Sequence, residues 1–159
     1  MLVAMVAKQK GADVIISEVN KTRIAMAEEI GFTVVNPLET DLVAFVKERT
    51  EGRLADVVFE VSGAQSAVDI MTEVAGMVAI HGQPKEVNLF KFFWKELNLI
   101  GARVYEKEDY NESIQLITEE LLPIEKIITA VEPLGKILNV FEDIDNNPEG
   151  MKYLVDCTM

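Results

Sequence analysis

The sequence has few of the residues that metal centres and disulfide frameworks require. Its 159 residues include one cysteine, Cys157, and one histidine, His81. A single cysteine excludes both an internal disulfide and a zinc site built from several thiolates. A single histidine excludes a cluster of several imidazole ligands. We therefore expect no metal site within this chain, and the cytoplasm is the default compartment for this cysteine usage.

Positive charge and long apolar runs are also scarce. Fifteen lysines and arginines stand against 27 acidic residues, for a formal charge of −12. This balance argues against nucleic acid and against anionic membrane surfaces as partners. No apolar run reaches membrane-spanning length, and the apolar start at Met1–Ala7 lacks the basic leader and cleavage pattern of a signal peptide. The hydrophobic content of 49% predicts a globular chain with a real core.

Short apolar runs alternate with helical patterns up to Tyr105. The runs predict strands at Asp13–Ser17, Thr33–Val35, Asp56–Val61, Met77–His81 and Leu97–Tyr105. The helical patterns predict helices at Met1–Lys10 and Lys21–Ile30, one capped by Asn36, one opened by a capping box from Ser62, and Phe90–Glu96. Strands alternating with helices in this way indicate an α/β fold with a doubly wound parallel sheet.

The chain changes character after Tyr105. A tail follows, with helices expected at Tyr110–Leu121 and Leu134–Ile144 and strands expected at Ile127–Val131 and Met151–Cys157. Within these segments, the lone Cys157 is interpreted as inert packing in the terminal strand. In the aromatic helix before the tail, Phe90, Phe92, Phe93 and Trp94 are interpreted as partly core and partly a surface that faces a second copy.

One strand end stands out because it carries an acid. The apolar residues of the run DVIISE suit a strand buried on both faces, and the run ends on Glu18. Ligands of open α/β sheets bind in the crevice at the carboxyl ends of the strands. There, the Glu18 carboxylate could accept hydrogen bonds from the hydroxyls of an adenosine ribose. The alternative is an acid that only favours the dipole of the next helix.

Six phrases, in this order and spacing, resemble the zinc-dependent medium-chain dehydrogenases of the sorbitol, butanediol and threonine dehydrogenase branch. They are GADVIISEVNKTR from Gly11, ADVVFEVSG from Ala55, GMVAIHGQP from Gly76, LIGARVY from Leu99, ITAVEPL from Ile128 and MKYLVDC from Met151. The resemblance covers nearly the whole chain. It implies a Rossmann-like domain over residues 1–104 and, over 105–159, an αβαβ tail that returns to the family's catalytic domain.

The resemblance implies a role in binding the cofactor NAD for individual residues. Glu18 would bind the adenosine ribose and favour NAD over NADP, because a 2′-phosphate would face a carboxylate. Arg23 would lie against the adenine, whereas its alternative reading is a solvated helix arginine. Further positions would line the cofactor, namely Ser62 and Gly63 at a strand end, His81, Gly82 and Gln83 by the nicotinamide, and Ala102, Arg103 and Val104 through their backbone. His81 is not expected to be catalytic, and Ser62 also has its helix-capping reading.

The glycine fingerprint of the fold is not found in this sequence. G-x-G-x-x-G is expected roughly 20 residues before the ribose acid, a distance that reaches back to about Met1. We therefore expect the first strand, the phosphate-binding turn and the family's zinc ligands to be missing, and NAD binding to be weak or lost. Strands Asp13–Ser17 and Asp56–Val61 would lose the neighbour they share. Tail strands, another molecule or a rearranged sheet would fill the gap.

Three functions remain open on this basis. The first is the coenzyme-binding portion of an NAD-dependent alcohol or polyol dehydrogenase that is inactive as an isolated chain. The second is a non-enzymatic remnant or split subunit that acts by assembly with a partner polypeptide, such as a missing N-terminal catalytic domain. The third is another Rossmann-like enzyme, such as a methyltransferase. We also expect a homo-oligomer, in which Leu97–Arg103 would pair with its own copy as the resemblance implies.

Overall fold

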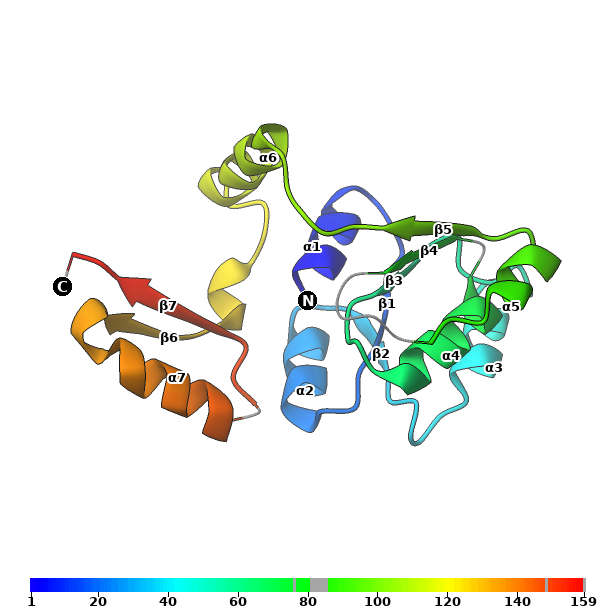
Figure 1. Cartoon of the computed structure of the whole chain (residues 1–159), viewed down its shortest axis with the longest axis horizontal. Coiled ribbons are helices and arrows are strands. Elements are labelled where there is room, and N and C mark those ends of the chain that lie inside the picture. The colour runs from blue at the N-terminus through cyan, green and yellow to red at the C-terminus, as the bar shows by residue number, and fades with distance from the viewer. Residues whose placement is uncertain (76, 81–85, 148, 159) are drawn as a thin grey trace. The chain divides into compact units, whose positions relative to one another are not determined.

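The computed structural model describes residues 1–75, 77–80, 86–147 and 149–158. These residues form two compact units (Figure 1). Unit 1 comprises Met1–Asn36 and Asn111–Met159, and unit 2 comprises Pro37–Tyr110. The division at residues 104 and 105 that the resemblance implies concerns the family's domains, and it stays a prediction.

Unit 1 begins with a helix–strand–helix–strand segment. Its elements are α1 (Leu2–Gln9), β1 (Ile15–Ser17), α2 (Lys21–Glu29) and β2 (Thr33–Val35). Strands β1 and β2 are parallel, with Ile15 opposite Thr33. Gly31 ends α2 with φ +88°, a left-handed conformation that glycine adopts without steric cost. The predicted helices and strands of this segment are thus confirmed, with β1 shorter than predicted.

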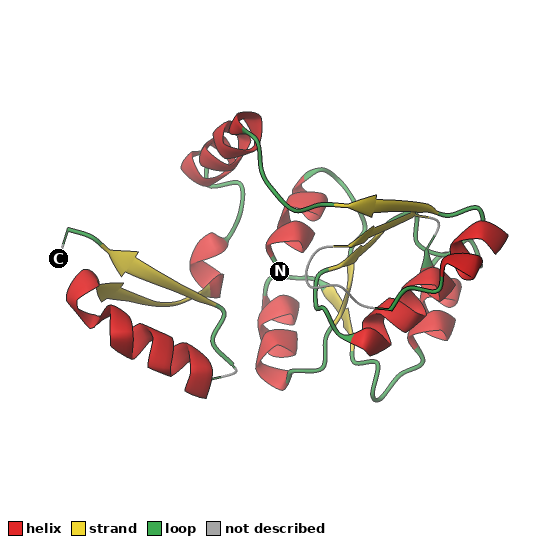
Figure 2. Cartoon of the chain, in the orientation of Figure 1, coloured by secondary structure: helices red, strands yellow, loops and turns green. Residues whose placement is uncertain are grey.

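The second part of unit 1 is a strand–helix–strand motif that follows a helix. Its elements are α6 (Lys107–Thr118), which starts in unit 2, η1 (Ile124–Ile127), β6 (Ile128–Pro133), η2 (Leu134–Lys136), α7 (Ile137–Asn146) and β7 (Lys152–Asp156). Strands β6 and β7 are parallel and pair with each other (Figure 2). The tail strands therefore do not fill the gap beside β1 or β3. The core of unit 1 joins both parts through Met5, Ala27, Phe32, Leu116, Leu122 and Ile127.

Unit 2 is a three-stranded parallel sheet with its helices. The elements are α3 (Leu42–Arg49), β3 (Val58–Glu60), α4 (Gln65–Val74), β4 (Met77–Ile80), α5 (Leu89–Trp94) and β5 (Asn98–Gly101). The strand order is β3-β4-β5. Val58 packs against a core from α4 and α5 that contains Val68, Met71 and Phe92. Every strand pairing in the described residues is parallel, which confirms the α/β class.

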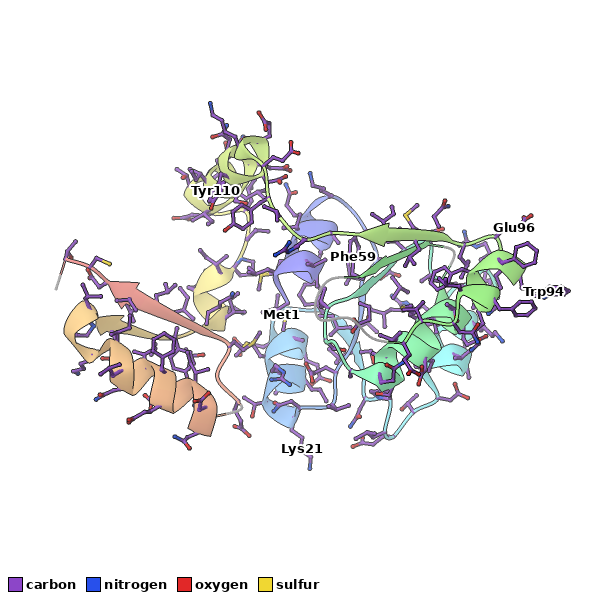
Figure 3. The ribbon with its side chains drawn as sticks, in the orientation of Figure 1. Met1, Lys21, Phe59, Trp94, Glu96 and Tyr110 are labelled. Atoms are coloured by element: carbon purple, nitrogen blue, oxygen red, sulfur yellow. The ribbon has the colours of Figure 1, made fainter. Side chains whose placement is uncertain are left out.

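Among the described strands, β1 and β3 each pair with a neighbour on one side only. Within the described residues β1 pairs with β2 alone, and β3 pairs with β4 alone. The side chains at β3 differ in burial. Glu60 is buried, whereas Phe59 is 52% exposed (Figure 3), and Val61, the residue after β3, is 50% exposed. One face of the unit 2 sheet therefore lacks apolar cover at β3.

Three predicted boundaries are wrong. Asn36 does not cap α3, because a turn intervenes and the Asp41 carboxylate accepts from the N–H of Ala44. Ser62 does not cap α4, whose N-cap is Ala64 without a side-chain bond. Strand β5 ends at Gly101 rather than at Tyr105. At α3 a nearer residue, Asp41, takes the capping role, whereas α4 begins without a side-chain cap.

The aromatic helix α5 is partly core and partly exposed surface, as predicted. Only Phe92 is buried, whereas Phe90, Phe93 and Trp94 are 66–75% exposed, with Trp94 at the outer end of the helix (Figure 3). On the other side of the helix, Lys91 and Lys95 both pair with Glu73 of α4, at 2.9 and 2.7 Å. These two lysine hydrogen bonds lower the pKa of Glu73 to about 2. The burial of Phe92 and these ion pairs connect α5 to α4.

The Asp41 cap predicts the behaviour of two substitutions. Asp41→Ala should lower the free energy of unfolding by about 1 kcal/mol, because it removes the acceptor for the Ala44 N–H, which is 3.0 Å away. Asp41→Asn keeps a side-chain oxygen acceptor and should change it by a few tenths at most. Urea unfolding followed by circular dichroism measures both. Equal losses in the two variants would show that the cap does not stabilise α3.

Candidate functional site

Glu18 lies at the carboxyl end of a parallel strand, in unit 1. It follows β1 directly, and its N–H donates to the Val35 carbonyl oxygen at 3.1 Å, which extends the pairing of β1 with β2 to this residue. The loop then enters α2, whose N-cap is Asn20. The Asn20 side-chain oxygen accepts from the N–H of Arg23 at 3.0 Å. Strand end and helix start are thus fixed within a few residues of each other.

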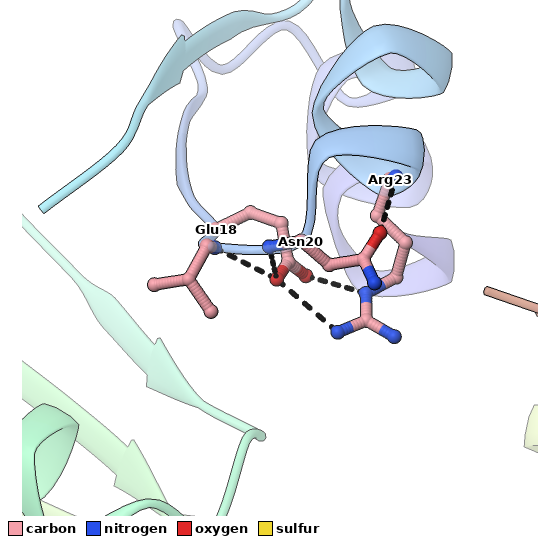
Figure 4. A network of polar contacts seen from close by, with 4 residues as sticks. Glu18, Asn20 and Arg23 are labelled. Atoms are coloured by element: carbon pink, nitrogen blue, oxygen red, sulfur yellow. Dashed lines mark hydrogen bonds and ion pairs between the residues drawn. The ribbon is translucent and has the colours of Figure 1, made fainter. Parts of the chain in front are cut away.

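The Glu18 carboxylate is the centre of a local hydrogen-bond network (Figure 4). Its Oε1 accepts from the backbone N–H of Val19 at 2.8 Å and of Asn20 at 2.9 Å. The Arg23 guanidinium binds both oxygens, with Nε 2.9 Å from Oε2 and Nη2 3.3 Å from Oε1. The network combines a charged pair with two main-chain donors, so the side chain is held in one orientation.

These contacts set the charge of Glu18. Burial raises its pKa, but the hydrogen bonds from Arg23, Asn20 and Val19 and the charge of Arg23 together lower it below the ordinary value of 4.5. The side chain remains 22% exposed, so an incoming hydroxyl can reach it.

In unit 2 a second carboxylate, that of Glu60, lies at the end of a strand and accepts hydrogen bonds from the turn that follows. Glu60, the last residue of β3, is 4% exposed. Its Oε1 accepts from the N–H of Ser62 at 2.8 Å, from the N–H of Gly63 at 3.0 Å and from the Ser62 hydroxyl at 2.5 Å. The same hydroxyl accepts from the N–H of Ala64 at 3.1 Å. Glu60 therefore fixes the turn over residues 61–64, which we name the β3 turn.

Gln65, the first residue of α4, forms hydrogen bonds with the main chain before α5. The Gln65 side-chain amide donates to the Glu86 carbonyl oxygen at 2.8 Å and accepts from the Glu86 N–H at 3.2 Å. It also donates to Asp69 at 2.8 Å. Gln65 thus ties the first residue of α4 to the main chain that leads into α5.

The other predicted site residues of unit 2 follow the ends of β4 and β5. His81, Gly82 and Gln83 come after β4 and lie outside the described residues. Ala102, Arg103 and Val104 come after β5 and are exposed. Strands β3 and β5 flank β4 in a parallel sheet, so their carboxyl ends lie on the same side of the sheet. The β3 turn follows one of these ends and Ala102 follows the other. Two strand spacings, roughly 10 Å, separate the two ends. One dinucleotide could span that distance.

The predicted residues thus fall into two groups. Glu18 and Arg23 are in direct contact in unit 1, and Ser62 and Gly63 share one carboxylate in unit 2. Three contributing residues, Asn20, Glu60 and Gln65, were not predicted. Glu60 left a signal in the sequence, since it is an acid inside the apolar run VVFEV. Asn20 also left one, as an asparagine before a helical pattern.

The residues that the structure describes do not fit a zinc centre. No group of three or more histidine, cysteine, aspartate or glutamate side chains among them is arranged to hold a metal ion. Cys157 is exposed and accompanied by no other thiol in the sequence. We therefore derive no step through zinc. In the same part of the chain, no helix has the length and apolarity needed to cross a bilayer.

Parallel strands that end in a hydrogen-bonded acid are typical of nucleotide-binding α/β proteins. The family model described as zinc-binding dehydrogenase matches residues 1–119, and the chain belongs to this family. It is 48% identical to a 2-dehydro-3-deoxy-L-galactonate 5-dehydrogenase of Pseudoalteromonas atlantica, over 98% of this chain and 48% of that protein. It is 34% identical to an (R,R)-butanediol dehydrogenase of Neisseria gonorrhoeae, over 98% and 47%. The chain spans about half the length of the curated relatives it matches.

Solved structures agree with this family. A 2R,3R-butanediol dehydrogenase from Bacillus subtilis matches with a TM-score of 0.84 and 26% identity, over 97% of this chain and 46% of that one. A zinc-binding dehydrogenase from Sinorhizobium meliloti, bound to NADP, matches with a TM-score of 0.80 and 25% identity, over 97% and 48%. The resemblance to medium-chain dehydrogenases is thereby confirmed, which argues against the methyltransferase alternative.

The lowered pKa of Glu18 predicts a pH dependence of stability. A carboxylate whose folded pKa lies below 4.5 stabilises the fold above that pH, and the contribution is lost as the pH falls through the folded value. The free energy of unfolding should therefore fall below pH 4.5 more steeply in the wild type than in Glu18→Gln. Urea unfolding at pH 7, 4.5 and 3 measures the difference. Glu28→Gln, at an exposed position of α2, is the control and should keep the wild-type slope.

Proposed function

We propose that this chain supplies the coenzyme-binding part of an NAD-dependent, zinc-type alcohol or polyol dehydrogenase. The observation that carries the proposal is Glu18, a carboxylate at the carboxyl end of a parallel strand, held in one orientation by Arg23 and two backbone N–H groups. The family match supports the same conclusion. The reaction of the whole enzyme would be hydride transfer between a secondary alcohol and the coenzyme.

Glu18 would act on the adenosine end of the coenzyme. Its carboxylate would accept hydrogen bonds from the ribose hydroxyls, while Arg23 would lie against the adenine and keep the carboxylate charged. A 2′-phosphate would bring negative charge toward this carboxylate, so NAD is preferred over NADP. When bound, NAD supplies the nicotinamide ring that accepts the hydride. Within unit 2, the proposed coenzyme contacts are Ser62, Gly63 and Ala102–Val104.

The substrate class follows from the relatives. Their names include butanediol, sorbitol and D-arabitol-phosphate dehydrogenases, which supports a polyol or a related secondary alcohol as the substrate. The matched stretch is only about half of each of them. We therefore propose that turnover needs the zinc-bearing catalytic part of the enzyme in addition, and that this chain alone is inactive and binds NAD weakly.

A second function is assembly, and the exposed apolar surface favours it. Large apolar side chains from several elements are more than 60% exposed, namely Leu38, Leu89, Phe90, Phe93, Trp94, Val104, Tyr105 and Leu138. Single exposed apolar residues are ordinary, but four of these lie together at α5. The unpaired edges of β1 and β3 add main-chain donors and acceptors. We propose that this chain associates with copies of itself or with a partner polypeptide.

Coenzyme titration tests the first function. In calorimetry, NAD should bind the chain with a dissociation constant above the micromolar range, and NADP should bind roughly tenfold more weakly because its 2′-phosphate faces Glu18. Glu18→Ala should weaken NAD binding and reduce the preference for NAD over NADP. Glu28→Ala, on the same helix as Arg23, should leave both affinities unchanged.

Two outcomes would contradict this proposal. If neither coenzyme binds at millimolar concentration, the coenzyme-binding role fails. If the purified chain by itself reduces NAD with butanediol, sorbitol or threonine, the inference that it is inactive alone fails, and a catalytic centre must be sought within it.

Light scattering tests the assembly function. At micromolar concentration the measured mass should correspond to at least two chains. Replacing Phe93 and Trp94 by serine removes exposed apolar side chains that no core depends on, and it should shift the mass toward one chain if α5 contributes. A monomer of the wild-type chain at this concentration would count against self-association.

A further inference from the structure

The β3 turn uses its hydrogen-bond donors internally. The N–H groups of Ser62 and Gly63 and the Ser62 hydroxyl all donate to a single oxygen, Oε1 of Glu60. The next N–H, that of Ala64, donates to the Ser62 hydroxyl oxygen. From Ser62 to Ala64, every N–H and O–H group therefore already has an acceptor.

The geometry of this turn is that of an anion site which is already filled. Gly63 has φ +66°, and its N–H and that of Ser62 converge on one point. Consecutive main-chain N–H groups that converge in this way form a concave nest that binds phosphate and other anions. Here the anion is the side chain of Glu60, which reaches the nest from within the chain and is 4% exposed.

The groups left for a ligand are acceptors. In the described part of the chain, the hydrogen bonds at Ser62 and Gly63 involve their N–H and hydroxyl groups, and none involves their carbonyl oxygens. Carbonyl oxygens bind hydroxyl or amide donors and repel phosphate oxygens. Glu60 thus decides whether the β3 turn offers hydrogen-bond acceptors or donors to a ligand. With the carboxylate in place, the turn suits a sugar hydroxyl. Without it, the freed N–H groups suit an anion.

We propose that Glu60 is a positioning residue that makes the β3 turn an acceptor site for a ribose hydroxyl of the coenzyme and excludes phosphate from it. This inference rests on the proposed function, because it takes the β3 turn to lie beside a bound dinucleotide. Glu60 itself is buried and acts through Ser62 and Gly63. It determines which part of a dinucleotide the turn accepts, which a purely structural carboxylate would not do.

The experiment follows backbone amide signals of the ¹⁵N-labelled chain during titration with NAD and, separately, with inorganic phosphate. In the wild type, NAD should shift the amide signals of Gly63 and Ala64, whose peptide groups contain the carbonyls of Ser62 and Gly63, and phosphate should leave them in place. Glu60→Leu removes the acceptor at similar size. It should raise the NAD dissociation constant about tenfold and should make the Gly63 amide signal respond to phosphate.

Two further variants complete the test. Glu60→Gln keeps a carbonyl oxygen that can accept, so NAD affinity should fall less, about threefold, and the phosphate response should be smaller. If Glu60→Leu does not fold, as judged by circular dichroism, this variant carries the comparison. Glu96→Gln is the control, since Glu96 is an exposed acid that lies at the outer end of the α5 region, and it should behave as the wild type (Figure 3).

The outcomes separate this inference from the proposed function. NAD shifts at Glu18–Arg23 without shifts at Gly63 and Ala64 would overturn the role of Glu60 and leave coenzyme binding intact. Wild-type phosphate shifts at Gly63, or unchanged NAD affinity in folded Glu60→Leu and Glu60→Gln, would also overturn it. No NAD shift at any amide would overturn both.

Discussion

Both candidate strand ends depend on one constraint, namely that main-chain N–H groups beyond a parallel strand need an acceptor. The chain meets it with a glutamate at each place. Glu18 accepts from the N–H groups of the next two residues, and Glu60 accepts from those of Ser62 and Gly63. Each carboxylate accepts from two consecutive main-chain N–H groups at one oxygen and thereby orders its turn. These two side chains therefore determine the conformation of the turns that carry the candidate coenzyme contacts.

The two carboxylates differ in which groups compensate their charge, and they therefore differ in whether they could contact a ligand directly. Glu18 has a guanidinium partner, keeps part of its surface accessible, and could bind a ligand directly. Glu60 is buried and compensated by three donors at one oxygen, so it can act only through the turn that it holds. Both leave acceptors rather than donors at the strand ends. Such ends suit the hydroxyl-bearing sugars of a dinucleotide, whereas its phosphates need N–H donors from elsewhere.

Much of this could be predicted from the sequence, because strand and helix signals are local. Apolar runs and glycine stops placed most of the elements, and an acid after VIIS indicated Glu18. Competition between nearby caps was not predictable, since Asn36 and Asp41 both suit an N-cap and only the turn between them decides. An acid inside the apolar run VVFEV marks Glu60 in the sequence, but the three donors that it accepts from are recognised only once the turn is folded. The division of α5 into a core residue, Phe92, and exposed aromatic residues was predicted, whereas the ion pairs of Lys91 and Lys95 with Glu73 were not.

The double ion pair at Glu73 has a consequence for recognition. A flexible apolar surface must lose side-chain and segmental freedom when it binds, and that loss weakens association. Helix α5 is anchored by two lysines one helical turn apart, and Phe90 stacks on Trp94 with ring centroids 6.1 Å apart. Its aromatic side is therefore ordered before any encounter, so the entropy lost on contact is small. High ionic strength weakens the anchor while it strengthens apolar association, and the two effects on α5 oppose each other.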